Sequence, residues 1–322
     1  MSTHGLIDPR DPALAGEPVV ALATLVAATG STSKKLGAKM MVGQSGRLIG
    51  AVTIGGCVDA QVVEAADSLV ATGGRRLLSI SLDDDEAWEI GLTCGGTVEV
   101  LLERVEPLNG ADPTIAAHRR ALDLVESGET AVIVTPLEAE GTTYTIAESE
   151  VEGRQFGQRV FLDRVAPPTT VMIVGAGQVA MSLTRFAREL GMRTIVIDGR
   201  ERYATRDRFP DADEIRIGMP SEIVGSLPAT KHVAAVLVAH DYKYELPVLR
   251  QLLRAAVGYL GMLGSKKRGA AVRDMLRQEG FTDDELARIH TPIGLDLGGK
   301  QSPEVALAII AEIVAVRSGK RA

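Results

Sequence analysis

The chain is poor in aromatic residues and in cysteine, and both shortages exclude classes of function. Phe, Tyr and Trp make up 3% of its 322 residues, and Trp88 is the only tryptophan. Proteins that bind single-stranded nucleic acid by base stacking depend on aromatic side chains. The two cysteines are too few for a disulfide framework or a four-cysteine metal cluster. We therefore expect no nucleic-acid partner and no disulfide-stabilised secreted domain.

An excess of basic residues and a long apolar run are missing as well. The 35 Lys and Arg residues stand against 42 Asp and Glu residues, a net charge of −7 at pH 7. This balance argues against broad binding to a phosphate backbone. No apolar run is long enough to cross a bilayer, and residues 1–10 lack the basic start and apolar core of a secretory signal. The sequence thus predicts a cytoplasmic protein without a membrane partner.

The length of the chain predicts two domains. Its composition, with 45% hydrophobic and 24% charged residues, is ordinary for globular proteins. Pro167 and Pro168 lie in the clearest linker, and we place the domains at residues 1–165 and 166–322. The strand patterns of the first domain come in hairpin-like groups between helical patterns. They predict a smaller α+β domain with a mostly antiparallel or mixed sheet.

The second domain begins with the pattern of a dinucleotide-binding unit. An apolar strand over residues 171–174 leads into Gly-Ala-Gly-Gln-Val-Ala at 175–180. The helix predicted after it has one apolar stripe, formed by Val179, Leu183, Phe186 and Leu190. A second strand ends at Asp198, and 198 − 177 = 21 residues separate it from Gly177. This spacing predicts an α/β domain with a Rossmann-like parallel sheet.

Each residue of this motif has a physical role in cofactor binding. Gly175 permits the tight turn, and Gly177 lets the backbone approach a pyrophosphate closely. The pyrophosphate would rest on amides of the helix that begins at Gln178, where the helix dipole favours negative charge. Asp198 would accept hydrogen bonds from ribose hydroxyls. The alternative is a glycine turn that serves only the packing of helix against strand.

Two further places at predicted strand ends are candidates for ligand contacts. His240 and Asp241 directly follow an apolar strand pattern, and the ligand crevice of a parallel sheet lies outside the carboxyl ends of its strands. The alternative for His240 is a loop histidine bonded to the backbone. Gly264 and Ser265 precede three basic residues at a helix start, which favours a second anion site.

The two cysteines lie next to paired glycines. Cys57 follows two glycines at the start of a predicted helix, and Cys94 precedes another two. A helix N-terminus favours the thiolate, which is a nucleophile and a soft metal ligand. Small neighbours also let another molecule approach the sulfur. The alternative for each cysteine is a small apolar residue buried in the core.

Taken together, six stretches of the chain resemble the XdhC/CoxI family. The resemblance covers the chain from about residue 19 to residue 316. The stretches are Gly-Gly-Cys-Val-Asp at 55–59, Gly-Leu-Thr-Cys-Gly-Gly-Thr-Val-Glu-Val at 91–100, Val-Gly-Ala-Gly at 174–177, His-Asp at 240–241, Tyr-Leu-Gly-Met-Leu-Gly-Ser-Lys at 259–266 and His-Thr-Pro-Ile-Gly-Leu-Asp at 290–296.

The resemblance implies a maturation factor for molybdenum hydroxylases of the xanthine dehydrogenase or carbon monoxide dehydrogenase type. Such a protein would bind the molybdenum pterin cofactor, with or without a cytosine nucleotide, and hold it while sulfur replaces an oxo ligand. It would then pass the cofactor to the apo-enzyme, and a cysteine desulfurase would donate the sulfur. We hypothesise that Cys57 and Cys94 face a cleft between the domains as metal ligands near the molybdenum.

Two other functions compete with this interpretation. The Rossmann unit is equally expected in an NAD(P)-dependent oxidoreductase, with His240 as the acid or base. Against it, the sequence offers no clear catalytic partner for His240. The second competing interpretation is a structural scaffold that binds no ligand. Because homodimers are the commonest soluble oligomers, we expect this chain to form a homodimer.

Overall fold

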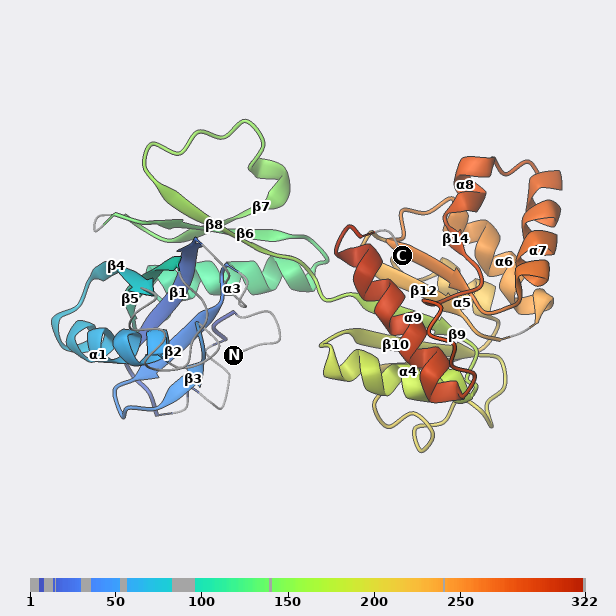
Figure 1. Cartoon of the computed structure of the whole chain (residues 1–322), viewed down its shortest axis with the longest axis horizontal. Helices are drawn as coiled ribbons and strands as arrows, with labels where there is room; N and C mark the ends of the chain where they lie inside the picture. Colours follow the sequence, from blue (N-terminus) through green and yellow to red (C-terminus); the bar gives the residue numbers. More distant parts are fainter. Residues whose placement is uncertain are drawn as a thin grey trace. The chain divides into compact units, whose positions relative to one another are not determined.

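The computed structural model describes residues 6–8, 14, 16–29, 36–52, 57–82, 96–138, 141–239 and 241–320. The chain divides into two compact units, residues 1–167 and residues 168–322, both drawn in Figure 1. We call them unit 1 and unit 2 and describe each by itself. In these ranges no helix is both long and apolar enough to span a membrane.

The described part of unit 1 contains two antiparallel sheets, which confirms the predicted α+β architecture. The larger sheet has the order β3-β2-β1-β5-β4 and the smaller has β7-β6-β8. Helix α1 packs on the larger sheet through its apolar stripe of valine, alanine and leucine, and α3 packs against the smaller sheet. The elements are β1 (Val20–Ala28), β2 (Lys39–Gly43), β3 (Leu48–Gly50), α1 (Cys57–Thr72), β4 (Arg75–Leu82), β5 (Gly96–Val105), α3 (Pro113–Glu126), β6 (Ala131–Pro136), β7 (Tyr144–Ala147), the short 3₁₀ helix η2 (Glu148–Glu150) and β8 (Val160–Val165).

A buried polar network ties the two sheets of unit 1 together. The guanidinium of Arg75 on β4 forms an ion pair with Glu103 on β5. It also donates to the carbonyl oxygen of Pro136 at 2.7 Å and to the hydroxyl of Thr143 at 2.8 Å. Thr143 in turn donates to Glu103 at 3.0 Å. Because each buried charge has a charged partner and further hydrogen bonds, the network holds the sheets in register without an uncompensated charge.

Unit 2 is a doubly wound parallel sheet, which confirms the predicted Rossmann-like fold. Its six strands have the order β11-β10-β9-β12-β13-β14, and every pairing is parallel. Numbered from β9, this is the order 3-2-1-4-5-6 of dinucleotide-binding domains. The elements are β9 (Thr170–Val174), α4 (Gln178–Glu189), β10 (Arg193–Asp198), β11 (Glu214–Ile217), α5 (Pro220–Gly225), β12 (Val233–Leu237), α6 (Tyr242–Leu253), β13 (Tyr259–Met262), α7 (Lys266–Gln278), α8 (Asp283–Ala287), β14 (Ile289–His290) and α9 (Ser302–Arg317).

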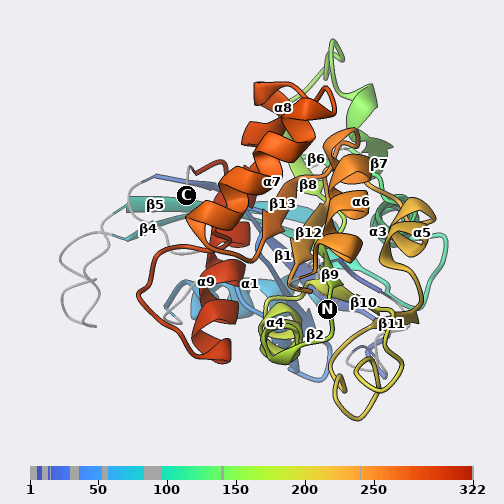
Figure 2. The ribbon, with the colours of Figure 1, turned by 90° about the vertical axis from the view of Figure 1, so that its right-hand side faces the viewer.

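Apolar side chains fill both faces of this sheet. Helices α4 and α9 pack together on one face, and Figures 1 and 2 show them side by side. Helices α5, α6, α7 and α8 contribute to the core on the other face. Because both faces are covered, β9 after its first residue and all of β12 are unbroken apolar runs. The carboxyl ends of the strands are left as the edge where a ligand can bind.

Helix α4 differs from its predicted stripe at one position. Leu183 is fully buried, whereas Leu190 is 48% exposed, so the prediction for Leu190 was wrong. The helix ends at Glu189, and Gly191 follows with a φ of +65°. Leu190 therefore caps the helix instead of extending its inner face. That inner face is made by small and branched residues, namely Ala180, Leu183, Thr184 and Ala187.

Candidate functional site

The first glycine of the turn between β9 and α4 is required by the fold itself. Gly175 has a φ of +113°, and a Cβ built on it would lie 2.7 Å from the backbone nitrogen of Ala239. Backbone atoms cannot yield as a flexible side chain can. Gly175 therefore lets the end of β9 pass close to the segment that follows β12. Its conformation and its surroundings explain this glycine without any ligand.

The second glycine is different, because the fold does not require it. Gly177 is the N-cap of α4 with a φ of −83° and a ψ of −172°, a conformation that any residue adopts. Among the described residues, no heavy atom outside the adjoining backbone lies within 4 Å of the place where its Cβ would be. No side chain of that part of the chain caps this end of the helix, and Gln178, its first residue, is exposed. The open space and the uncapped helix start suit a negatively charged group that approaches the backbone closely.

Asp198, at the end of β10, is bonded to this turn and to a neighbouring arginine. Its carboxylate accepts a hydrogen bond from the amide of Ala176 at 2.7 Å. It also accepts from the backbone nitrogen, Nε and Nη2 of Arg200 at 2.8 to 2.9 Å. Burial would raise the pKa of Asp198, but these hydrogen bonds outweigh it and hold that pKa below its usual value. A ribose hydroxyl would have to share the carboxylate with Arg200, and the predicted ribose contact of Asp198 stays a prediction.

Two arginines border the glycine turn. The guanidinium of Arg200 lies over the ring of Tyr203, 4.2 Å from the ring centroid, and is about half exposed. Arg208, which the motif analysis missed, donates to the carbonyl oxygen of Ala176 at 3.0 Å. The Asp-Gly-Arg sequence at 198–200 was the available signal for Arg200. For Arg208 there was none, because the contact spans 32 residues of chain.

Acidification should weaken unit 2 through Asp198. Because the folded-state pKa of this group lies below its usual 3.8, its contribution is present above pH 3.8 and is lost as the pH falls through the lower, folded value. Asp198→Asn should therefore cost about 1.5–3 kcal/mol at pH 7 and flatten the stability curve of unit 2 between pH 5 and the acid limit. Urea unfolding at a series of pH values measures both effects. An unchanged acid slope would contradict this assignment.

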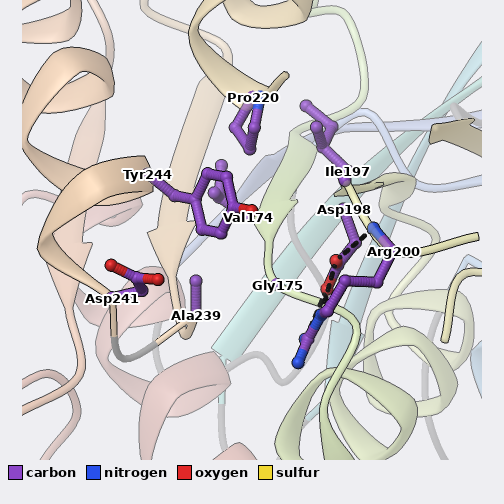
Figure 3. A pocket seen from close by; sticks show the side chains of 10 residues that line it. Val174, Gly175, Ile197, Asp198, Arg200, Pro220, Ala239, Asp241 and Tyr244 are labelled. Atoms are coloured by element: carbon purple, nitrogen blue, oxygen red, sulfur yellow. Dashed lines mark hydrogen bonds and ion pairs between the residues drawn. The ribbon is translucent and has the colours of Figure 1, made fainter. Parts of the chain in front are cut away.

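A pocket lies where β9, β10 and β12 end, as Figure 3 shows. The carboxylate of Asp198 and its ion pair with Arg200 form one side, and Tyr244 and Asp241 lie on the other. Its volume of about 170 Å³ is below the roughly 300–1,000 Å³ of pockets that enclose whole ligands, so it suits one part of a larger molecule. The pocket is lined by Val174, Gly175, Ile197, Asp198, Gly199, Arg200, Pro220, Ala239, Asp241 and Tyr244.

The structure brings some of the predicted residues together and leaves others apart. Gly175, Asp198 and Asp241 line the pocket, although Asp241 also caps α6 by accepting from the Lys243 amide at 2.9 Å. Gly264 and Ser265 are not among the lining residues. The hydroxyl of Ser265 caps α7 by accepting from the Arg268 amide at 3.2 Å. An anion at this helix start would compete with that cap, and the second anion site stays a prediction.

The predicted metal ligands fall largely outside the described residues. Cys94 and His240 lie outside them altogether. Cys57 begins α1, at the helix N-terminus that the sequence predicts, but its side chain is outside the described part. Among the side chains that are described, no three His, Cys, Asp or Glu residues are arranged to hold a metal ion. The roles of both cysteines and of His240 stay predictions.

Comparison with solved structures gives the same fold. A crystal structure described as a xanthine dehydrogenase from Bacillus halodurans superimposes with a TM-score of 0.80, covering 100% of this chain and 97% of that one. The two sequences are 23% identical, so this likeness concerns the fold alone.

Curated relatives cover nearly the whole chain. A Bacillus subtilis protein, named as a probable subunit of xanthine dehydrogenase, is 25% identical over 95% of this chain and 96% of its own length. The molybdenum cofactor insertion chaperone PaoD of Escherichia coli is 27% identical over 92% of this chain and 83% of its own length.

Family models match both parts of the chain. The model described as the XdhC and CoxI family matches residues 13–81, in unit 1. The model described as the XdhC Rossmann domain matches residues 171–313, nearly all of unit 2. The two matches stand in the order in which the sequence motifs place them, and the chain belongs to the XdhC and CoxI family.

Proposed function

We propose that this protein is a molybdenum cofactor chaperone, which holds the pterin cofactor in the crevice of unit 2 and delivers it to a molybdenum hydroxylase. One observation carries the binding part of the proposal. Gly177 leaves open space at the uncapped start of α4, although the fold would accept a side chain there. The relative named as a molybdenum cofactor insertion chaperone supports the choice of cargo.

The residues of the crevice fit the phosphate portion of such a cofactor. The first amides of α4 and the helix dipole would hold its negative charge. Arg200 has a half-exposed guanidinium at the rim and can add a charged hydrogen bond. Asp198 orients that guanidinium and the turn through Ala176. When bound, the cofactor supplies the molybdenum centre that its client enzyme needs.

We further propose that the cofactor is sulfurated while this chain holds it, with a cysteine desulfurase as donor. Clients of the xanthine dehydrogenase or carbon monoxide dehydrogenase type suit this role. In this proposal Cys57 and Cys94 lie near the molybdenum, because thiolates are soft ligands. We also propose that this chaperone forms a homodimer.

The double substitution Cys57→Ser and Cys94→Ser tests the role of the two thiols. We expect it to lower the molybdenum content of the purified protein by roughly tenfold, since an alcohol is a much poorer ligand for a soft metal site than a thiolate. Pterin content and the melting temperature serve as controls for binding of the organic part and for folding. Wild-type molybdenum content and sulfuration in the variant would rule out the proposed ligands.

An NAD(P)-dependent oxidoreductase remains the second candidate, because the strand order of unit 2 is the one that binds dinucleotides. The discriminating experiment is thermal unfolding of the full chain with the anaerobically isolated molybdenum cofactor, with NADPH, or with neither. A ligand that binds only the folded state raises the melting temperature by mass action. Protection by the molybdenum cofactor alone supports the chaperone. Protection by NADPH alone would overturn it in favour of the oxidoreductase.

A further inference from the structure

A second polar cluster in unit 2 lies apart from the pocket and centres on Glu312. This residue of α9 is 6% exposed. Its carboxylate accepts from the hydroxyl of Tyr259 on β13, from the amide of Gly294 at 2.8 Å, and from Nδ1 of His290 on β14, which lies 3.1 Å away. Three donors therefore converge on one buried carboxylate.

These contacts determine how the histidine carries its proton. Burial would raise the pKa of Glu312, but the hydrogen bonds from His290, Tyr259 and Gly294 outweigh it and lower that pKa. Burial together with Glu312 raises the pKa of Tyr259, so that its hydroxyl stays protonated as a donor. An ionised Glu312 can only accept, and Nδ1 of His290 must then carry the hydrogen. In the neutral ring this leaves Nε2 with a free lone pair.

The imidazole ring is held in place from two sides. The centroid of the His290 ring lies 4.7 Å from that of the Tyr259 ring. The loop that follows His290 packs closely against α9. At Gly294, with a φ of +92°, a Cβ would lie 3.0 Å from the backbone of α9. The His290 side chain is nevertheless 29% exposed, and among the described residues no partner of Nε2 is found.

A second histidine of this chain, His118, has a different environment. His118 in unit 1 is 1% exposed, and its Nδ1 accepts a hydrogen bond from the amide of Ile7 at 3.0 Å. Among the described residues no carboxylate is bonded to that ring, and the nearby charge is that of Lys39, which lowers the pKa of His118 together with the larger effect of burial. His290 has the opposite arrangement, since a buried carboxylate bonds one ring nitrogen while the side chain as a whole stays partly exposed. Orienting a ring through a carboxylate is how proteins prepare a histidine to bind or to accept a proton.

The strand order places His290 at the far side of the crevice. His290 is the last residue of β14, beside Gly261 of β13, and β14 is the outermost strand on the β12 side. In this fold a dinucleotide crosses the carboxyl edge from the second strand, here β10, over the first to the fourth and beyond. Asp198 and the glycine turn belong to the β10 and β9 side. His290 is therefore suited to the other half of the same ligand.

We propose that Nε2 of His290 accepts a hydrogen bond from an N–H or O–H group on the ring system that the cofactor carries beyond its phosphates, with Glu312 as the positioning residue. This inference rests on the proposed function, because it takes the molybdenum pterin cofactor as the ligand. It assigns the phosphates to the Gly177 end and the ring system to the His290 end.

The test compares two probes on one set of variants. His290→Asn keeps a donor near Glu312 but removes the acceptor at Nε2. We expect it to weaken binding of the anaerobically isolated molybdenum cofactor by roughly tenfold, measured as bound molybdenum in equilibrium dialysis. Binding of inorganic pyrophosphate, which reaches only the Gly177 end, should not change. Equal binding of the cofactor by wild type and variant would overturn the inference while leaving the proposed function intact.

A second variant separates positioning from packing. At a pH where the ring is neutral, ¹⁵N spectra of the wild type should show His290 protonated at Nδ1 and free at Nε2. Glu312→Gln should shift this tautomer balance and weaken cofactor binding, whereas a merely structural contact would lower the melting temperature without that signature. An Nε2-protonated ring in the wild type would contradict the inference. If the wild type binds pyrophosphate but no cofactor, the proposed function and this inference are both overturned.

Discussion

Serine in place of Gly177 should abolish most cofactor binding and leave the fold at least as stable as before. The N-cap conformation accepts serine, and the open space around the missing Cβ leaves room for it. The new hydroxyl should cap the first amides of α4, which adds a few tenths of a kcal/mol. The same hydroxyl occupies the space and the donors that a phosphate would use. We therefore expect cofactor affinity to fall by at least roughly tenfold, or about 1.4 kcal/mol.

Equilibrium dialysis of the molybdenum cofactor and urea unfolding of the full chain measure the two halves of this prediction. Gly157→Ser is the matched control, because Gly157 in unit 1 also has open space around its missing Cβ and lies outside unit 2. It should change neither quantity. Unaltered cofactor affinity in the Gly177→Ser protein would show that the start of α4 does not hold the ligand.

Alanine in place of Gly175 should do the reverse and damage unit 2 itself. The added Cβ would lie 2.7 Å from the backbone nitrogen of Ala239. The alanine would also have to adopt a φ of +113°, which side chains rarely allow. Strain at such a φ costs about 1–3 kcal/mol, and overpacking against a rigid backbone costs about 1–3 kcal/mol more. We expect unit 2 to lose roughly 2–6 kcal/mol of its unfolding free energy. Hydrogen exchange of the β9 and β12 amides reports this loss within unit 2.

Gly280→Ala separates strain from overpacking in that experiment. Gly280 also has a positive φ, of +96°, but nothing lies within 4 Å of the place where its Cβ would be. Its cost should be that of the backbone alone, about 1–2 kcal/mol. If the Gly175 substitution cost no more than this control, the close approach to Ala239 would not be a determinant of the fold.

The sequence was sufficient to predict the parts of the fold that depend on local pattern. The run from Val171 to Asp198 specifies strand, turn, helix and strand through neighbouring residues, and it predicted the Rossmann unit of the family. Leu190 was assigned to the apolar stripe because helical periodicity continues through that position. The sequence signal against it was Gly191, the glycine that follows, whose positive φ is typical of a helix end.

The buried polar contacts of both units depend on residues that are distant in the chain. Glu312 meets His290 across 22 residues and Tyr259 across 53, and no spacing rule connects them. The available signal was a single carboxylate within the apolar run of α9, which indicates a buried partner. In unit 1, Glu103 is similar, since Arg75 and Thr143 lie 28 and 40 residues away. Such pairs follow from the strand order, which local patterns do not determine.

Metal and pterin analysis of the purified chain tests the central claim most directly. The protein would be isolated from molybdate-fed cells that also express the genes for pterin synthesis, with the Gly177→Ser variant prepared in parallel. We expect molybdenum and pterin in comparable amounts on the wild type, and little of either on the variant. A wild-type protein free of both, yet stabilised against unfolding by NADPH, would contradict the chaperone and favour the oxidoreductase.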